Sequence, residues 1–166
     1  YEISLGLVGS EMCIRDRGLY DPANEPDIAY PYLFSYFQGE EWRTQREVRR
    51  LLDRYFTTAP DGIPGNDDTG TMSAWAVFSM MGLYPDCPGE PYYTLTSPVF
   101  DKVTVTLDPK YYPAGELVIE TERSGAGDVY IGSMTLGGRP LKKYRISHGE
   151  LVGGGRLVFG LQPERK

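Results

Sequence analysis

Two adjacent carboxylates in one short loop are the first residues of this sequence that could do chemistry. Asp67 and Asp68 lie in the stretch APDGIPGNDDTG, residues 59–70, directly before a strongly apolar segment. Charges this close to a hydrophobic core are costly unless they are hydrogen-bonded, paired or bound to a metal. Neighbouring acids can divide the work of activating a water molecule, and their mutual repulsion should raise the pKa of one of them.

A purely structural interpretation of the same loop stays open. Asp and Thr are common helix N-caps, so Asp68 or Thr69 can simply cap the next helix, while Asn66 and Asp67 form an Asx turn. A second acidic string, NEPD at Asn24–Asp27, also precedes a predicted helix. Oxygen-bearing side chains at two helix N-termini form a candidate site for a hard cation or a polarised water.

Three helices are predicted in the first half of the chain. Apolar residues recur on one stripe of residues 44–56, and Thr44 with Glu47 is typical of a capping box at the start of this helix. An earlier helix, capped by Asn24, is predicted over residues 24–39, with Pro31 expected to kink it or to shift its start. The third helix, about Thr71–Met81, is apolar almost all round, which predicts a buried helix.

From about residue 92 the apolar residues alternate with polar ones. Four such runs are separated by Gly, Pro and Asp clusters, at residues 102–107, 116–121, 128–136 and 155–161. They predict an antiparallel sheet. Helices followed by strands indicate an α+β arrangement in separate layers or domains. We therefore expect the end of a larger helical domain over residues 18–88 and a small antiparallel β domain over residues 89–166.

Charge and hydropathy exclude several classes of protein. The chain has 166 residues and a net charge of −6, and the basic side chains of residues 46–54 alternate with acidic ones. A nucleic-acid partner is therefore not expected, because such proteins carry basic patches. No run approaches the roughly twenty apolar residues of a transmembrane helix, so no membrane span is expected.

The first seventeen residues, YEISLGLVGSEMCIRDR, show neither a helical or strand period nor the apolar core of a signal peptide. They resemble the translation of a sequencing-library adapter, and we interpret residues 1–17 as a disordered artefact. Without them the chain has fifteen basic and twenty acidic side chains, a net charge of −5 and one cysteine, Cys87. On this interpretation the remaining residues are the C-terminal piece of a longer polypeptide.

Three strings carry a resemblance: NEPDIAYPYLFSYFQGEEWRTQREVRRLLDRYF, PDGIPGNDDTGTMSAWAVFSMMGLYP and YTLTSPVFDKVTVTL. In this order they are similar to glycoside hydrolase family 92, the calcium-dependent exo-acting α-mannosidases, and the resemblance extends over residues 18–166. It implies that the helices are the last ones of a catalytic (α/α)6 barrel, that hydrolysis inverts the anomeric configuration, and that Ca²⁺ is the cofactor. It further implies a mannose-containing glycan as substrate, a missing N-terminal part of the same polypeptide, and a secreted or periplasmic bacterial enzyme.

The resemblance also implies roles for individual residues. The general base falls on Asp67 and Asp68, whereas Asn24, Glu25 and Asn66 match substrate-binding positions. Asn24, Glu25 and Asp68 are the implied calcium ligands. In an inverting mechanism the base activates water on one face of the sugar, and an acid about 6.5–9.5 Å away protonates the leaving oxygen. The family's acid is a glutamate upstream of the NEP string, so this chain alone is expected to be inactive.

Two other interpretations stay open. The β region can be a carbohydrate-binding or structural module, for which an exposed row of aromatic residues, with Tyr111, Tyr112 and Tyr130 as candidates, is the expected sign. Another (α/α)6 inverting glycosidase keeps the chemistry and changes the sugar. Trp75 is expected in the core, because a tryptophan inside an apolar helix is usually buried. His148 is expected at the surface or at a strand end, without a metal role.

Overall fold

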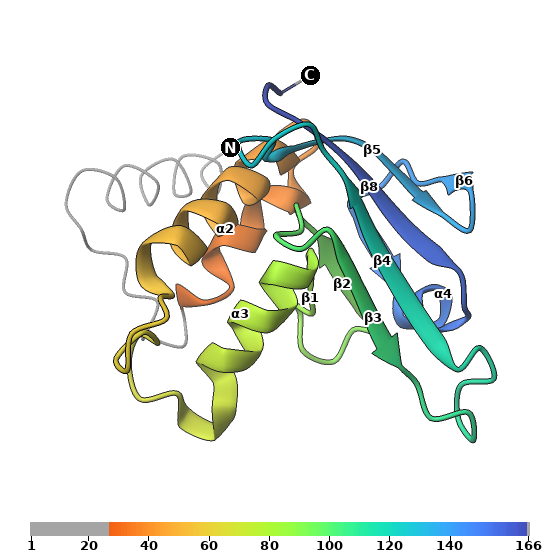
Figure 1. The fold of residues 1–166 in the computed structure, drawn as a ribbon, viewed down its shortest axis with the longest axis horizontal. Helices are drawn as coiled ribbons and strands as arrows, with labels where there is room; N and C mark the ends of the chain where they lie inside the picture. The colour runs from red at the N-terminus through yellow and green to blue at the C-terminus, as the bar shows by residue number, and fades with distance from the viewer. Residues whose placement is uncertain (1–26, 166) are drawn as a thin grey trace.

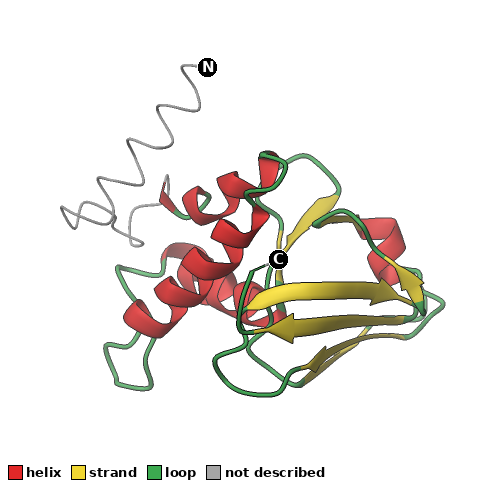
Figure 2. Cartoon of the chain, turned by 90° about the horizontal axis from the view of Figure 1, so that it is seen from above, coloured by secondary structure: helices red, strands yellow, loops and turns green. Residues whose placement is uncertain are grey.

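The computed structural model describes residues 27–165 and places a group of helices beside two β-sheets (Figure 1). The helical half consists of a 3-10 helix η2 (Tyr30–Tyr36), helix α2 (Glu41–Tyr55), a short 3-10 turn η3 (Asp68–Gly70) and helix α3 (Thr71–Met81). Figure 2 shows these helices gathered at one end of the sheets. The α+β class predicted from the sequence is therefore confirmed.

Helix α2 buries the predicted stripe but begins earlier than predicted. Val48 and Leu51 are each 1% exposed. The helix starts at Glu41, so Thr44 and Glu47 lie buried inside it and the predicted capping box is wrong. An acidic first residue is favourable next to the positive end of the helix dipole, which supports the earlier start. Glu47 instead accepts hydrogen bonds from arginine side chains on the same helix.

The other two helical segments agree with their predictions in part. Residues 27–39 contain the 3-10 helix η2 with Pro31 in its first turn, and the rest of the predicted helix 24–39 lies outside the described residues. Helix α3 has the predicted bounds, because Gly82 ends it in the left-handed conformation at φ 89°. It is not buried all round: it packs one face on α2 and β1, and Val77 on another face is 53% exposed.

In the part of the chain that the structure describes, eight strands form two sheets. They are β1 (Leu83–Tyr84), β2 (Tyr92–Leu95), β3 (Lys102–Thr106), β4 (Glu116–Glu122), β5 (Tyr130–Leu136), β6 (Arg139–Pro140), β7 (Arg145–Ser147) and β8 (Arg156–Gln162), with the short helix α4 (His148–Val152) before the last. The strand orders are β1-β2-β7 and β3-β4-β8-β5-β6. The sheet is not wholly antiparallel as predicted, because β4 and β8 run parallel. Apolar and polar residues can alternate in the same way in parallel and in antiparallel strands, so this pattern does not reveal the relative direction of neighbouring strands.

Among the described residues, two hydrophobic clusters support the architecture. One lies among the strands and includes Leu157 and Phe159, both 0% exposed, and the other lies among the helices around Tyr32 and Trp75. The predicted boundary at residues 88 and 89 falls between β1 and β2, which pair with each other; the division into domains stays a prediction. Within residues 27–165, no helix combines the length and the hydropathy needed to span a bilayer.

Candidate functional site

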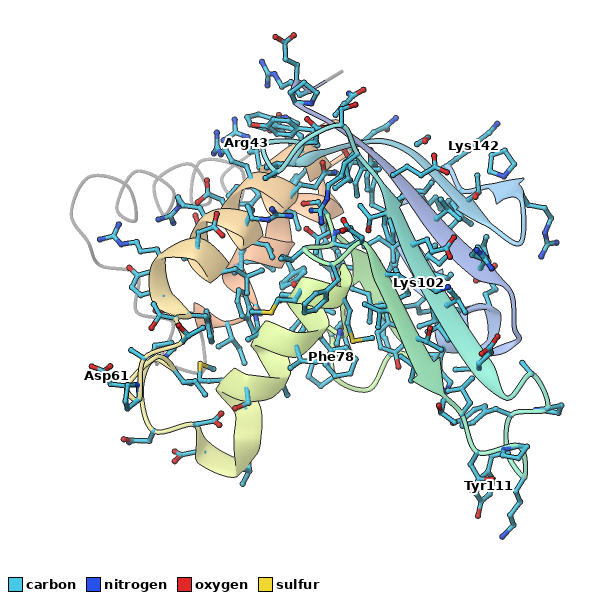
Figure 3. All side chains as sticks on the ribbon, in the orientation of Figure 1. Arg43, Asp61, Phe78, Lys102, Tyr111 and Lys142 are labelled. Carbon is cyan, nitrogen blue, oxygen red and sulfur yellow. The ribbon has the colours of Figure 1, made fainter. Side chains whose placement is uncertain are left out.

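The acidic loop begins with a tight turn that closes its base. The Thr57 amide donates to the Gly62 carbonyl at 2.9 Å, and the Gly62 amide donates to the Ala59 carbonyl at 2.9 Å. A Cβ atom at Gly62 would lie 2.2 Å from the Thr57 carbonyl oxygen, so only glycine fits there. Asp61 lies at the outer edge of this turn, where Figure 3 labels it.

Asp67 holds the loop against the start of helix α3. Its carboxylate accepts hydrogen bonds from the Ser73 amide at 2.9 Å and from the Ser73 hydroxyl at 2.5 Å. The Ser73 hydroxyl, followed by the Ser73 and Met72 amides, lowers the pKa of Asp67. The backbone of Asp67 is left-handed at φ 48°, a conformation that Asp tolerates better than most residues.

These contacts decide two sequence predictions. The N-cap position of α3 is Gly70, and its first turn is bound by the Asp67 side chain, so neither Asp68 nor Thr69 is the side-chain cap. Repulsion between the two carboxylates was expected to raise the pKa of one of them. This is not the case for Asp67, because hydrogen bonds from Ser73 lower its pKa. The role of Ser73 was not predicted from the sequence. The feature that could have indicated it is a hydroxyl-bearing residue six positions after the first Asp of the NDD string.

Asp68 presents the free carboxylate of the pair. Its main-chain carbonyl accepts from the hydroxyls of Thr69 and Thr71, each at 2.7 Å. Its side chain is exposed and makes no hydrogen bond or ion pair with any residue in the described range 27–165. Asn66 is also exposed. The loop therefore combines one anchored carboxylate with one that faces solvent.

The second acidic string is only partly visible. Asn24 and Glu25 lie outside the described residues, so the structure does not place them. The chain just after them is fixed to α3, because the indole Nε1 of Trp75 donates to the Ile28 carbonyl at 2.9 Å. Trp75 is 2% exposed, which confirms its predicted core position.

A metal centre is not formed by the described residues alone. Residues 27–165 contain no group of three or more His, Cys, Asp or Glu side chains arranged to hold an ion. Two of the three predicted calcium ligands, Asn24 and Glu25, lie outside this range, so the calcium site stays a prediction.

The aromatic residues of the β region do not form a row. Tyr111 and Tyr112 lie in the loop between β3 and β4, whereas Tyr130 begins β5 and its ring centroid is 6.5 Å from that of Trp42. The Tyr112 hydroxyl is 3.3 Å from His148 Nε2, and His148 directly follows strand β7, as expected for a residue at a strand end. These three tyrosines therefore do not form the exposed aromatic row that was expected of a carbohydrate-binding module.

Comparison with known proteins identifies the class and then the family. Residues 6–163 match the Glycosyl hydrolase family 92 catalytic domain, so the protein is of the glycoside hydrolase class. The chain belongs to glycoside hydrolase family 92. A curated relative, an uncharacterized secreted glycosidase of Arthroderma benhamiae, is 29% identical over 151 residues, which are 91% of this chain and 19% of the relative.

Solved structures of the same family share the fold. An α-mannosidase of this family from Bacteroides thetaiotaomicron, in complex with mannoimidazole, superposes with a TM-score of 0.81 at 28% identity over 89% of this chain. A family 92 inverting mannosidase from the same organism gives 0.78 at 35% identity over 93% of this chain. The chain spans 19% and 20% of these two proteins. Family membership excludes the interpretation as a different glycosidase family.

Proposed function

We propose that the chain is the C-terminal part of a calcium-dependent, inverting exo-α-mannosidase that removes terminal α-linked mannose from glycans. Membership of family 92 and 35% identity to an inverting mannosidase support the reaction. The observation that carries the proposal is the acidic loop, in which Ser73 anchors Asp67 and Asp68 is left free. On this proposal the helices of the chain are the last ones of an (α/α)6 barrel.

The two carboxylates take different roles. A general base must reach the attacking water and accept its proton, which requires an oxygen that is not already committed to other donors. Asp68 meets this requirement, because its exposed side chain has no partner among residues 27–165. Asp67, whose pKa is lowered by Ser73, is a weaker base and positions the loop. Asn66, exposed beside them, binds the substrate through its amide.

In this proposal the calcium ion would be held by Asn24, Glu25 and Asp68. All three would supply oxygen ligands, which suit Ca²⁺, and Asp68 would give one carboxylate oxygen to the ion and keep the other for the attacking water. Glu25 precedes Ile28 by three residues, which is at most about 10 Å of extended chain. Because the Ile28 carbonyl is hydrogen-bonded to Trp75 on α3, the segment just after the NEPD string and the acidic loop are joined to the same helix. When bound, the ion binds sugar hydroxyls and helps to orient the ring.

The general acid belongs to an upstream part of the polypeptide, so the chain alone lacks turnover in this proposal. The enzyme acts outside the cytoplasm, in the medium or the periplasm of a bacterium. A relative named as a secreted glycosidase supports a location outside the cytoplasm, and structural neighbours from Bacteroides thetaiotaomicron support a bacterial source.

The test uses the complete polypeptide that contains this chain. Asp68→Asn should reduce the turnover of an aryl α-mannoside by about 100- to 10,000-fold, the usual contribution of a general base. Asp61→Asn, an exposed acid in the same loop, is the matched control and should retain turnover. Proton NMR of the first product should show β-mannose. Normal turnover in Asp68→Asn, or α-mannose as the first product, would refute the assignment.

A further inference from the structure

A cavity of about 510 Å³ lies between the 3-10 helix η2 and the segment that leads into strand β7. Its volume is in the range of small-molecule sites, roughly 300–1,000 Å³. Tyr36 comes from η2, while Lys142, Lys143 and Arg145 come from a segment more than one hundred positions later. No residue of the acidic loop is among those that line it. Figure 3 shows Lys142 on the opposite side of the view from Asp61.

In the described chain, three basic side chains and one acidic side chain line the cavity, although the whole chain has a net charge of −6, and the acids Asp86 and Glu90 lie near Arg145. Lys142 and Lys143 are exposed and have no ion-pair partner within residues 27–165. Glu41 is the single acid among the described residues that line the cavity, and its carboxylate already accepts a hydrogen bond from the Gly39 amide at 2.8 Å. Two ammonium groups without an ion-pair partner in the described chain, on residues that line one cavity, attract an anion and are only weakly screened at short range.

Arg145 adds a fixed guanidinium beside the two lysines. Its Cζ atom lies 5.6 Å from the ring centroid of Tyr36 and 4.9 Å from that of Tyr92. One of its terminal nitrogens pairs with Glu90, while its Nε is buried without an acceptor in the described chain. A guanidinium held against two aromatic rings is restricted in its orientation, which favours contact with a carboxylate or phosphate group.

Tyr36 offers an apolar face and a neutral hydroxyl. The residue is 50% exposed, so its ring is accessible beside the charged groups. Burial around the phenol, with the carboxylate of Asp86, raises the pKa of Tyr36 to about 12, so the hydroxyl stays protonated near neutral pH. An exposed tyrosine ring next to polar groups suits a ligand with both an apolar and a hydroxylated side, as a pyranose ring has.

We propose that this cavity binds an anionic carbohydrate, a sugar that carries a phosphate or carboxylate group. The anion lies against Lys142, Lys143 and Arg145, and the sugar ring lies on Tyr36. The proposal goes beyond the mannosidase reaction, because binding at this cavity uses no residue assigned to hydrolysis. It is therefore tested on the 166-residue chain without any turnover.

The experiment titrates the ¹⁵N-labelled chain with mannose 6-phosphate, glucuronic acid, mannose and inorganic phosphate, followed by NMR shifts of the lining residues. At least one of the two anionic sugars should bind more tightly than both mannose and inorganic phosphate, and the tighter of them identifies the anion. The double variant Lys142→Gln/Lys143→Gln should weaken this binding about tenfold, the effect of losing two partly exposed charge contacts.

Lys110→Gln is the matched control, since Lys110 is an exposed lysine in the loop between β3 and β4 and does not line the cavity. It should bind like the wild type. Equal affinity for inorganic phosphate or for mannose would overturn the proposal, as would unchanged affinity in the double variant. Shifts confined to residues away from η2 and β7 would also overturn it. Unchanged circular dichroism spectra check that both variants are folded.

Discussion

The indole Nε1 of Trp75 donates a hydrogen bond to the main-chain carbonyl of Ile28 at 2.9 Å. This bond joins the segment that follows the NEPD string to helix α3, whose first turn is bound by Asp67. The Trp75 ring is stacked on Phe56 with centroids 5.5 Å apart, and the residue is 2% exposed. One buried side chain thus connects the segments that carry both acidic strings.

Removing the indole N–H should destabilise the chain measurably. Trp75→Phe leaves an aromatic ring but deprives the Ile28 carbonyl of its donor, and an unsatisfied partly buried acceptor costs about 1–3 kcal/mol. The free energy of unfolding, measured by urea denaturation, should fall by about this amount. Trp42→Phe is the control, because Trp42 is half-buried beneath arginine side chains and should cost less. Equal losses in both variants would contradict the importance of the Ile28 contact.

The anchor between Asp67 and Ser73 predicts a non-additive pair of substitutions. Asp67→Asn replaces one accepting oxygen with an amide group, and Ser73→Ala removes the hydroxyl donor, so each should lower the midpoint of thermal unfolding by a few degrees. Since both substitutions remove the same interaction, the midpoint of thermal unfolding of the double variant should lie close to the midpoints of the two single variants. Fully additive shifts would show that the two side chains act independently.

The same anchor predicts a pH dependence. In the folded state Ser73 lowers the pKa of Asp67 below the value of about 3.9 for an unfolded Asp. The unfolded chain therefore binds the proton first, and the anchor stabilises the fold above about pH 4. As the pH falls through the folded-state pKa this contribution is lost. The melting temperatures of the wild type and Asp67→Asn should differ at pH 7, and the difference should shrink as the pH is lowered below about 4; a difference of constant size would contradict the linkage.

Long periodic elements were predictable from the sequence because their burial is one-sided and regular. Helix α3 has the predicted bounds, and strands β3, β4, β5 and β8 each lie within two residues of their predicted runs. The two-residue strands β1 and β6 are too short to show a period and were not predicted. The start of α2 was missed because Thr44, which resembles a cap in sequence, is buried in the helix interior.

The candidate site was predictable only where residues that are adjacent in the sequence form it. Asp67 and Asp68 stand out by their position before an apolar helix, but their different environments depend on the left-handed backbone at Asp67 and on Ser73. The cavity beside Tyr36 was not predictable, because only the complete fold brings Tyr36 and Lys142 to the same cavity. No local pattern relates positions so far apart in the chain.

Gln45 provides a last test, of how the helices are fixed to the larger sheet. Its side-chain Oε1 accepts a hydrogen bond from the Ile131 amide at 2.8 Å, and Gln45 is 2% exposed. Gln45→Leu keeps a similar volume but leaves a buried N–H unpaired, which should cost about 1–3 kcal/mol in the free energy of unfolding. Hydrogen exchange at the Ile131 amide should accelerate accordingly. Gln38→Leu, at an exposed glutamine, should change neither quantity. If the Ile131 amide stays protected in Gln45→Leu, another group must accept its hydrogen bond, and α2 is then not joined to β5 through Gln45.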